Sequence, residues 1–395
     1  MLTRRAFFSV AAAGAATLST FSRLPKLHAA QYDLLIRGGR VIDPSRKVDA
    51  MADVGITGGR IAAVQPGIAS SNAAQTIDAT GRLVVPGLID IHTHAGRSAD
   101  APAICLSDGV TSLVDAGSQG ADRIDDVVAA AKGAPNRMRV LINIARTGIL
   151  GEGELMDISH ADVAAARAAV ERHRDVVIGI KARLSKGVAG ANDLEALRRA
   201  QAVATPLNIP VMIHMGDTVS PLPAILALLK RGDVVTHMYA PPPHGIFDDS
   251  GQLLPEVAAA RRRGVWFDVG NGRTGHITWA VAEHAMKARV LPDTISSDWT
   301  AEGRTDQVID FGNVLSKFLL LGMPLDQVIA RGTVNAAKVF PAFKGLGTLG
   351  VGAPADVAVL ELRQGRFEFD DNEHTKRTGR QRLFASAAIM GGRRV

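Results

Sequence analysis

Short apolar runs alternate with longer helical patterns between residues 86 and 340. Stretches such as 161–173 and 193–204 have the Ala, Leu and Arg content that is typical of helices. Eight strand–helix units over roughly 250 residues match the size of a (β/α)8 barrel, the TIM barrel. An open doubly wound sheet is the alternative, but the eight predicted strand–helix units favour the barrel. The predicted strands are 88–91, 111–114, 140–144, 176–180, 211–213, 234–235, 265–269 and 294–296.

The two ends of the chain share a different pattern, in which short apolar strands are separated by glycine turns. Strand-like runs at 32–37 and 53–56 each precede a Gly-Gly turn, and similar runs lie at 355–360 and 387–390. This spacing is typical of a small sheet sandwich. The sequence therefore predicts a composite β-sandwich, built from residues 31–86 and 341–395, beside a barrel at 87–340.

Residues 1–30 have the layout of a bacterial export signal of the twin-arginine type. Arg4 and Arg5 precede an Ala-rich stretch at 6–18, which is too short to cross a bilayer as a helix. Segment 27–30 is similar to a cleavage site, and it has no neighbouring cysteine for a lipid anchor. An ordinary basic N-terminus is the alternative. The pattern predicts twin-arginine export machinery as a partner, a periplasmic or secreted location, and no stable membrane anchor.

The formal net charge of +6 falls when the predicted signal is left out of the count. Of 45 basic residues, four lie in residues 1–30, which hold no acidic residue, so 41 basic and 39 acidic side chains remain. A net charge of +2 does not indicate nucleic-acid binding. The single cysteine, Cys105, excludes an intramolecular disulfide and any cysteine-rich metal cluster.

The strongest chemical signal is His92-Thr93-His94, which directly follows the first apolar run of the predicted barrel. Two side chains at i and i+2 of a strand point to the same face of the sheet. At the C-terminal end of a barrel strand, this pair of imidazoles is suited to chelate a divalent metal ion.

A lysine, two histidines and an aspartate follow directly, or nearly so, after four other predicted strands. Lys181 lies 87 positions after His94, which is about three strand–helix units of roughly 30 residues each. His214 and His237 follow after 33 and 23 positions, and Asp298 follows 61 positions later. These residues are therefore predicted on strands 1, 4, 5, 6 and 8, all at the C-terminal ends where barrel active sites form.

Lys181 requires a separate argument, because an ammonium group cannot bind a metal. Burial lowers the pKa of an amine, and a free amine can add carbon dioxide to become an anionic carbamate. We therefore predict two divalent ions, whose charge would make hydroxide available near neutral pH, with Asp298 moving the proton. The predicted ligands are His92, His94 and Asp298 for one ion, His214 and His237 for the other, and carbamylated Lys181 between them.

These residues resemble the amidohydrolase superfamily of metal-dependent hydrolases over residues 31–395, including the segments 85–94 and 352–357. Further segments resemble the deacetylase branch, which is close to the dihydroorotases. The resemblance implies hydrolysis of an acetyl amide or ester of a small carboxylate-bearing molecule, with zinc as the usual metal. The segments are 179–183, 213–216, 236–239, 245–248, 316–319 and 333–338.

The chain departs from this branch at Gly270-Asn271-Gly272, where the branch often has Gly-His-Gly. This change puts the substrate preference in doubt, as does Trp299 directly after Asp298. Arginines near strand ends could hold a substrate carboxylate, with surface ion pairs as the alternative, and a tyrosine could donate to an oxyanion or simply pack. The candidate substrate contacts are Arg146, Arg183, Tyr239, Asn271 and Arg273.

Three functions are compatible with this pattern. The first is the metal-dependent deacetylase. The second keeps the metals but acts on a cyclic amide, as dihydroorotases and hydantoinases do, or on a lactone. The third is a non-catalytic scaffold, which would be expected to have lost ligands. A homo-oligomer is left open.

Overall fold

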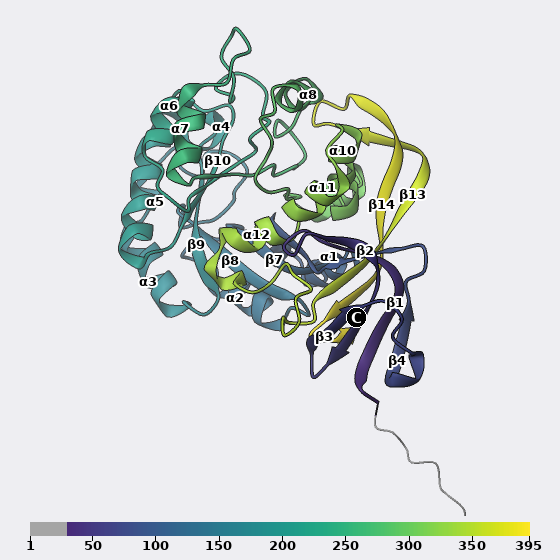
Figure 1. Cartoon of the computed structure of the whole chain (residues 1–395). Helices are drawn as coiled ribbons and strands as arrows, with labels where there is room; N and C mark the ends of the chain where they lie inside the picture. The colour runs from purple at the N-terminus through teal and green to yellow at the C-terminus, as the bar shows by residue number, and fades with distance from the viewer. Residues whose placement is uncertain (1–29) are drawn as a thin grey trace, which may run out of the picture.

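The computed structural model describes residues 30–395 and contains a curled sheet of seven parallel strands (Figure 1). Their spatial order follows the chain, and every neighbouring pair is parallel. They confirm seven of the eight predicted strands. The strands are β6 (Leu88–Thr93), β7 (Val110–Ala116), β8 (Arg137–Asn143), β9 (Val177–Arg183), β10 (Val211–His214), β11 (Val234–Thr236) and β12 (Trp266–Phe267).

The eighth predicted strand, at 294–296, is not a regular strand. The segment 294–299 makes isolated bridges to both ends of the seven-stranded sheet, Asp268 to Thr294 and Thr93 to Trp299. The Asp298 N–H donates to the His92 carbonyl at 2.7 Å. Asp298 has a φ of 51°, a left-handed conformation that interrupts an extended strand. The run at 294–296 still pairs with the segment after β12, because the N–H groups of Val269 and Asn271 donate to the Thr294 and Ser296 carbonyls at 3.2 and 3.0 Å.

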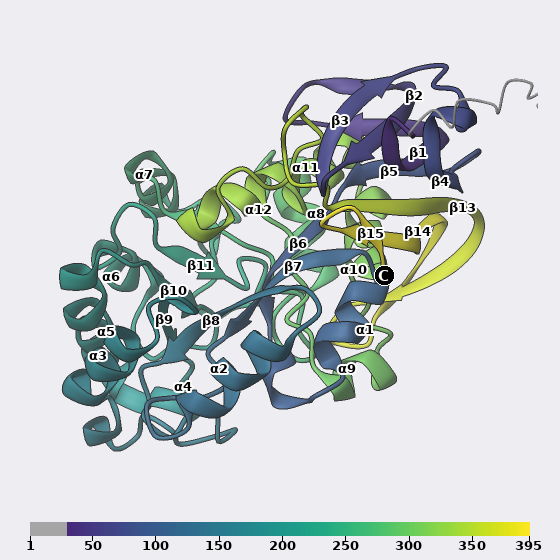
Figure 2. The same ribbon diagram turned by 90° about the horizontal axis from the view of Figure 1, so that it is seen from below.

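Helices connect the strands and pack outside the parallel sheet (Figure 2). Asp162 caps α3 by accepting a hydrogen bond from the Ala165 N–H, as its short carboxylate allows. The predicted helices at 161–173 and 193–204 are confirmed as α3 and α5. The helices are α1 (Ala101–Ser107), α2 (Ile124–Gly133), α3 (Val163–Arg172), α4 (Lys186–Ala189), α5 (Asp193–Leu207), α6 (Leu222–Ala227), α7 (Pro255–Arg263), α8 (Trp279–Lys287), α9 (Ala301–Asp306), α10 (Phe311–Leu320), α11 (Leu325–Arg331) and α12 (Val334–Val339).

Strands from both ends of the chain form a second sheet, in the order β15-β14-β13-β5-β1-β2-β3, with β4 paired to β1 (Figure 2). Its eight strands form one hydrogen-bonded network, and apolar residues from both ends, such as Ile36 and Val357, share one buried cluster. The strands are β1 (Tyr32–Asp43), β2 (Val48–Thr57), β3 (Arg60–Gln65), β4 (Ala73–Asp78), β5 (Leu83–Pro86), β13 (Val357–Asp370), β14 (Lys376–Met390) and β15 (Arg393–Arg394).

The long hairpin of β13 and β14 extends from the second sheet to α8 of the parallel-sheet region (Figure 1). At its tip, the Asp371 carboxylate accepts from the Trp279 N–H at 2.9 Å, and the Trp279 ring donates to the Thr375 carbonyl at 2.7 Å. The Asn372 side chain accepts from the backbone N–H groups of His276 and Ile277. The second sheet therefore anchors a loop that follows β12.

The predicted export signal lies outside the described residues except for Ala30, so it stays a prediction. Within residues 30–395, none of the helices combines the length and the apolar character that crossing a bilayer requires.

Candidate metal centre

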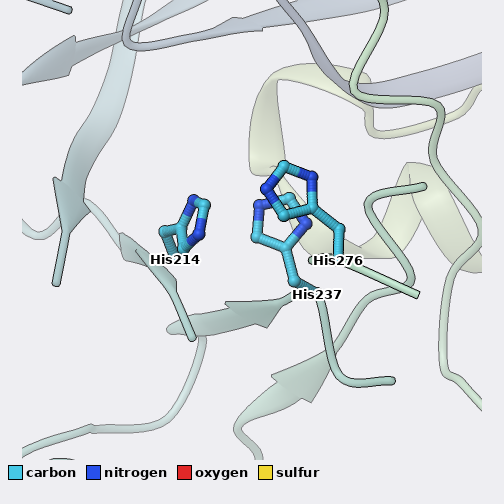
Figure 3. Close-up of side chains that lie close together, drawn as sticks. All are labelled: His214, His237 and His276. Atoms are coloured by element: carbon cyan, nitrogen blue, oxygen red, sulfur yellow. The ribbon is translucent and has the colours of Figure 1, made fainter. Parts of the chain in front are cut away.

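Two clusters of metal-ligand side chains lie beside each other at the C-terminal ends of the parallel strands. His92, His94 and Asp298 form the first, and His214, His237 and His276 form the second. Figure 3 shows the His214 ring facing the adjacent rings of His237 and His276. Within each cluster, one ligand atom from each residue lies within 4.8 Å of the others.

The first cluster gathers around one carboxylate oxygen. Asp298 Oδ1 lies 3.3 Å from His92 Nε2 and 3.2 Å from His94 Nε2. All three side chains are buried. His94 directly follows β6, and the Asp298 N–H donates to the His92 carbonyl in β6, so backbone pairing brings these groups together. The rings of His92 and His237 are 5.1 Å apart, which places the two clusters side by side.

Hydrogen bonds fix the proton of His92. Its Nδ1 lies 2.9 Å from Thr236 Oγ1, and that hydroxyl donates its only proton to Asp268 Oδ2 at 2.7 Å. Thr236 must therefore accept from His92, which places the imidazole proton on Nδ1 and leaves a lone pair on Nε2. Hydrogen bonds of this kind orient histidine ligands in metal sites.

Hydrogen bonds favour the same tautomer for His94 and His237. His94 Nδ1 lies 2.9 Å from Ser118 Oγ, which donates to Asp115 Oδ2 at 2.7 Å. His237 Nδ1 donates to the Gly270 carbonyl at 2.7 Å, and its Nε2 is buried without a protein partner. Each ring therefore turns an unprotonated Nε2 into the site.

These features fit divalent metal ions. Burial lowers the pKa of His92, His214 and His237 well below the ordinary value, so the rings are neutral, as ligands must be. A buried polar atom without a partner, such as His237 Nε2, costs free energy unless a ligand satisfies it. Neutral imidazoles with one carboxylate make a donor set suited to zinc.

Lys181 lies at the junction of the two clusters. Its side chain is almost fully buried, and Nζ is 3.2 Å from His92 Nε2. Burial lowers the pKa of Lys181 to about 7, so a large part of the population carries a free amine at neutral pH. The structure therefore brings together all six residues predicted as metal ligands.

His276 was given no role by the sequence, although it lies in the loop just after the altered Gly270-Asn271-Gly272 turn. Its Nδ1 lies 3.1 Å from Asp298 Oδ2, and its ring stacks on His237 at 3.9 Å between centroids. The sequence signal that could have found it is a histidine shortly after a glycine-rich turn that ends a barrel strand.

Two predicted substrate contacts, Tyr239 and Asn271, have polar groups that are buried and bonded within the protein. The Tyr239 hydroxyl donates to the Val290 carbonyl at 2.9 Å in the core. The buried Asn271 side chain accepts from Lys317 Nζ at 2.8 Å and donates to the Gly272 carbonyl. The Asn271 side chain therefore links the loop after β12 to α10.

The structure places Arg146 and Arg273 in ion pairs with partly exposed carboxylates. Arg146 pairs with Asp122 at 2.8 Å, and Arg273 pairs with Asp306 at 3.1 Å. These are the surface ion pairs that the sequence left as the alternative.

Arg183 is the predicted substrate contact that remains beside the clusters. It is the register partner of His214 in the parallel pair β9–β10, and it lies two residues after Lys181 on the same strand face. Its Nη1 pairs with the buried carboxylate of Glu154 at 2.8 Å, while 18% of the side chain stays exposed. The ion pair with Glu154 therefore holds the guanidinium in place, while part of the Arg183 side chain remains exposed.

Comparisons with known proteins agree with this geometry. Residues 83–387 match the sequence profile of the Amidohydrolase family. A deacetylase of Enterococcus faecalis is 31% identical over 370 residues, 91% of this chain and 98% of the relative. A deacetylase of Agrobacterium fabrum is 28% identical over 326 residues, 80% of this chain and 79% of the relative.

Two solved structures resemble the chain over nearly their whole length. A structure described as an adenine deaminase has a TM-score of 0.83 at 29% identity, and one described as a dihydroorotase has 0.82 at 26%. Each comparison covers 92% of this chain and 99% of the other.

Replacing Thr236 with valine tests the orientation of His92. The substitution keeps the shape but removes the acceptor of the Nδ1 proton, so we expect metal affinity to fall by about 10–100-fold. Competition with a chelator, followed by metal analysis, measures this loss. Thr294→Val is the matched control, because Thr294 also donates to Asp268 but contacts no metal-site histidine in the hydrogen-bond network described above. Equal losses in both variants would contradict the orienting role.

Proposed function

Since the chain belongs to the amidohydrolase family and is a hydrolase of C–N bonds, we propose that it removes an acetyl group from a small carboxylate-bearing molecule. The bond is an amide or an ester. The observation that carries this proposal is the pair of adjoining ligand clusters, with Lys181 at their junction. The Enterococcus relative named deacetylase, which the chain matches over 98% of its length, supports the acetyl group.

In this proposal, His92, His94 and Asp298 hold one divalent ion, and His214 and His237 hold the other. Zinc is the proposed metal, because the donors are imidazole nitrogens and carboxylate oxygens. Lys181, as a carbamate, would supply an anionic oxygen ligand beside His92. Two observations support this role of Lys181. Burial favours the free amine, and Lys181 Nζ lies 3.2 Å from His92 Nε2.

Divalent ions supply Lewis acidity and make hydroxide available near neutral pH. Asp298 then moves the proton. Its Oδ1 faces His92 and His94, whereas Oδ2 faces away from them toward His276. Oδ2 accepts the proton of the attacking water and returns it to the leaving nitrogen or oxygen, which restores the carboxylate. Arg183 holds the substrate carboxylate through its guanidinium.

A second candidate is hydrolysis of a cyclic amide with the same side chains. The similarity to the structure described as a dihydroorotase favours it, with a TM-score of 0.82 at 26% identity. Both reactions attack a carbonyl carbon, so the substrate pocket decides between them.

A substrate panel separates these candidates. We expect the zinc-loaded protein to hydrolyse N-acetyl or O-acetyl derivatives of small carboxylic acids, and to leave hydantoins, dihydroorotate and lactones intact. Turnover of cyclic amides alone would establish the second candidate.

Two variants test the proposed roles of Asp298 and Lys181. Asp298→Ala should lower kcat/KM by about 10²–10⁴-fold, the usual contribution of general acid–base catalysis. Lys181→Ala should lose activity and regain part of it with an added short carboxylate, which can occupy the vacated space.

Arg183→Gln tests the carboxylate contact. We expect KM to rise about tenfold to a hundredfold, because a hydrogen bond to a charged group contributes roughly 1.5–3 kcal/mol. The same variant is then assayed on the carboxamide analogue of the substrate, where the loss should be small. Arg146→Gln, at an exposed ion pair, is the matched control. Equal losses on carboxylate and carboxamide would show that Arg183 acts only through Glu154.

Export through the twin-arginine machinery is proposed from Arg4 and Arg5. We expect the double substitution Arg4→Lys and Arg5→Lys to retain the protein in the cytoplasm, as measured by cell fractionation. The wild-type chain is the control, and unchanged export of the variant would refute the assignment.

A further inference from the structure

The loop between β12 and α8 carries an extra imidazole into the centre. His276 stacks on His237 with 3.9 Å between ring centroids and 26° between ring planes. It meets His214 edge to face, with centroids 4.9 Å apart (Figure 3). Its Nδ1 is buried, makes no regular hydrogen bond within the described residues, and lies 3.1 Å from the second oxygen of Asp298.

The stacking argues against His276 as a ligand of the same ion as His237. An imidazole binds a metal through a lone pair that lies in the plane of its ring. Two rings that face each other at 26° cannot direct in-plane lone pairs to one point. The short distance from Nδ1 to Asp298 Oδ2 indicates a different partner, the carboxylate.

We propose that His276 is a positioning residue for Asp298, donating a hydrogen bond from Nδ1 to Oδ2. This inference rests on the proposed function, in which Oδ2 receives a proton. A carboxylate oxygen has two lone pairs, so one can accept from His276 while the other receives the proton of water. The proton that Oδ2 takes from water leaves with the product, so the carboxylate is restored.

The loop is built to hold His276 in this position. A Cβ atom at residue 272 would come within 1.7 Å of His276 Nδ1, and the φ of Gly272 is 53°, so glycine is required there on both counts. Asn372, buried at the tip of the β13–β14 hairpin, accepts from the His276 N–H at 2.9 Å and the Ile277 N–H at 3.0 Å. Asn372 also donates to the Gly272 carbonyl at 3.0 Å.

Four variants of the full chain test the proposal. His276→Ala removes the donor, His276→Asn retains an N–H donor near the same place, and Asn372→Ala loosens the loop without touching a ligand. Glu373→Ala, an exposed neighbour on the same hairpin tip, is the matched control. Each is measured for bound zinc, for the visible spectrum of the cobalt-substituted protein, for thermal unfolding, and for kcat and KM on the best substrate of the panel.

We expect His276→Ala to keep the full metal content of the wild type. Its kcat should fall about 10–100-fold, as for other residues that orient metal-site groups, with little change in KM. His276→Asn should recover part of the loss, Asn372→Ala should show a smaller loss of the same kind, and Glu373→Ala should match the wild type. The cobalt spectrum of His276→Ala should shift, because Asp298 changes its orientation.

Loss of one metal ion in His276→Ala would overturn the proposal by making His276 a ligand. An unchanged kcat, or no rescue by asparagine in a folded protein, would overturn it as well. If no acetylated substrate is hydrolysed, the proposed function fails, but the metal content and cobalt spectrum still decide the role of His276. In that case, an unshifted spectrum would refute the contact with Asp298.

Discussion

The carboxylate of Asp268 connects the fold to the metal centre. Buried at the end of the seven-stranded sheet, it accepts hydrogen bonds from the hydroxyls of Thr236, Thr294 and Ser296. Thr294 and Ser296 belong to the irregular segment before Asp298, whereas Thr236 ends β11 and orients His92. Three donors offset the cost of burying the group, although burial still raises the pKa of Asp268. The Asp268 carboxylate thus holds the segment before Asp298 in place and, through Thr236, fixes the tautomer of His92.

Asp90 holds the same segment from the other side. Lying on β6 two residues before His92, it accepts from both the hydroxyl and the N–H of Ser297. Asp298 is therefore fastened through its neighbours to both ends of the parallel sheet, which explains how it sustains a left-handed backbone at φ 51°. The proton transfer proposed for Asp298 benefits from this fixed orientation, since little reorganisation is needed at the moment of reaction.

The amino-acid sequence predicts the candidate metal ligands whose positions follow from strand geometry alone. His92, His94, Lys181 and His214 lie in or directly after regular strands, where period and register fix the side-chain direction. His237 has a φ of 67°, which ends the alternation of β11, so Tyr239 two residues later points into the core and not toward the site. His276 depends on a loop folded against a distant hairpin, a contact that no local pattern contains.

The second sheet therefore does more than complete the hydrophobic core. Its hairpin tip supplies Asp371 and Asn372, whose side chains bond to four backbone groups between Gly272 and Trp279. These bonds join residues about 95 positions apart in the sequence, and they fix the loop that ends beside Asp298. Because buried hydrogen bonds to backbone are costly to leave unmade, the two sheets cannot shift relative to each other at this point without disturbing the loop. The composite sheet from the two chain ends thus becomes part of the scaffold that shapes the metal centre.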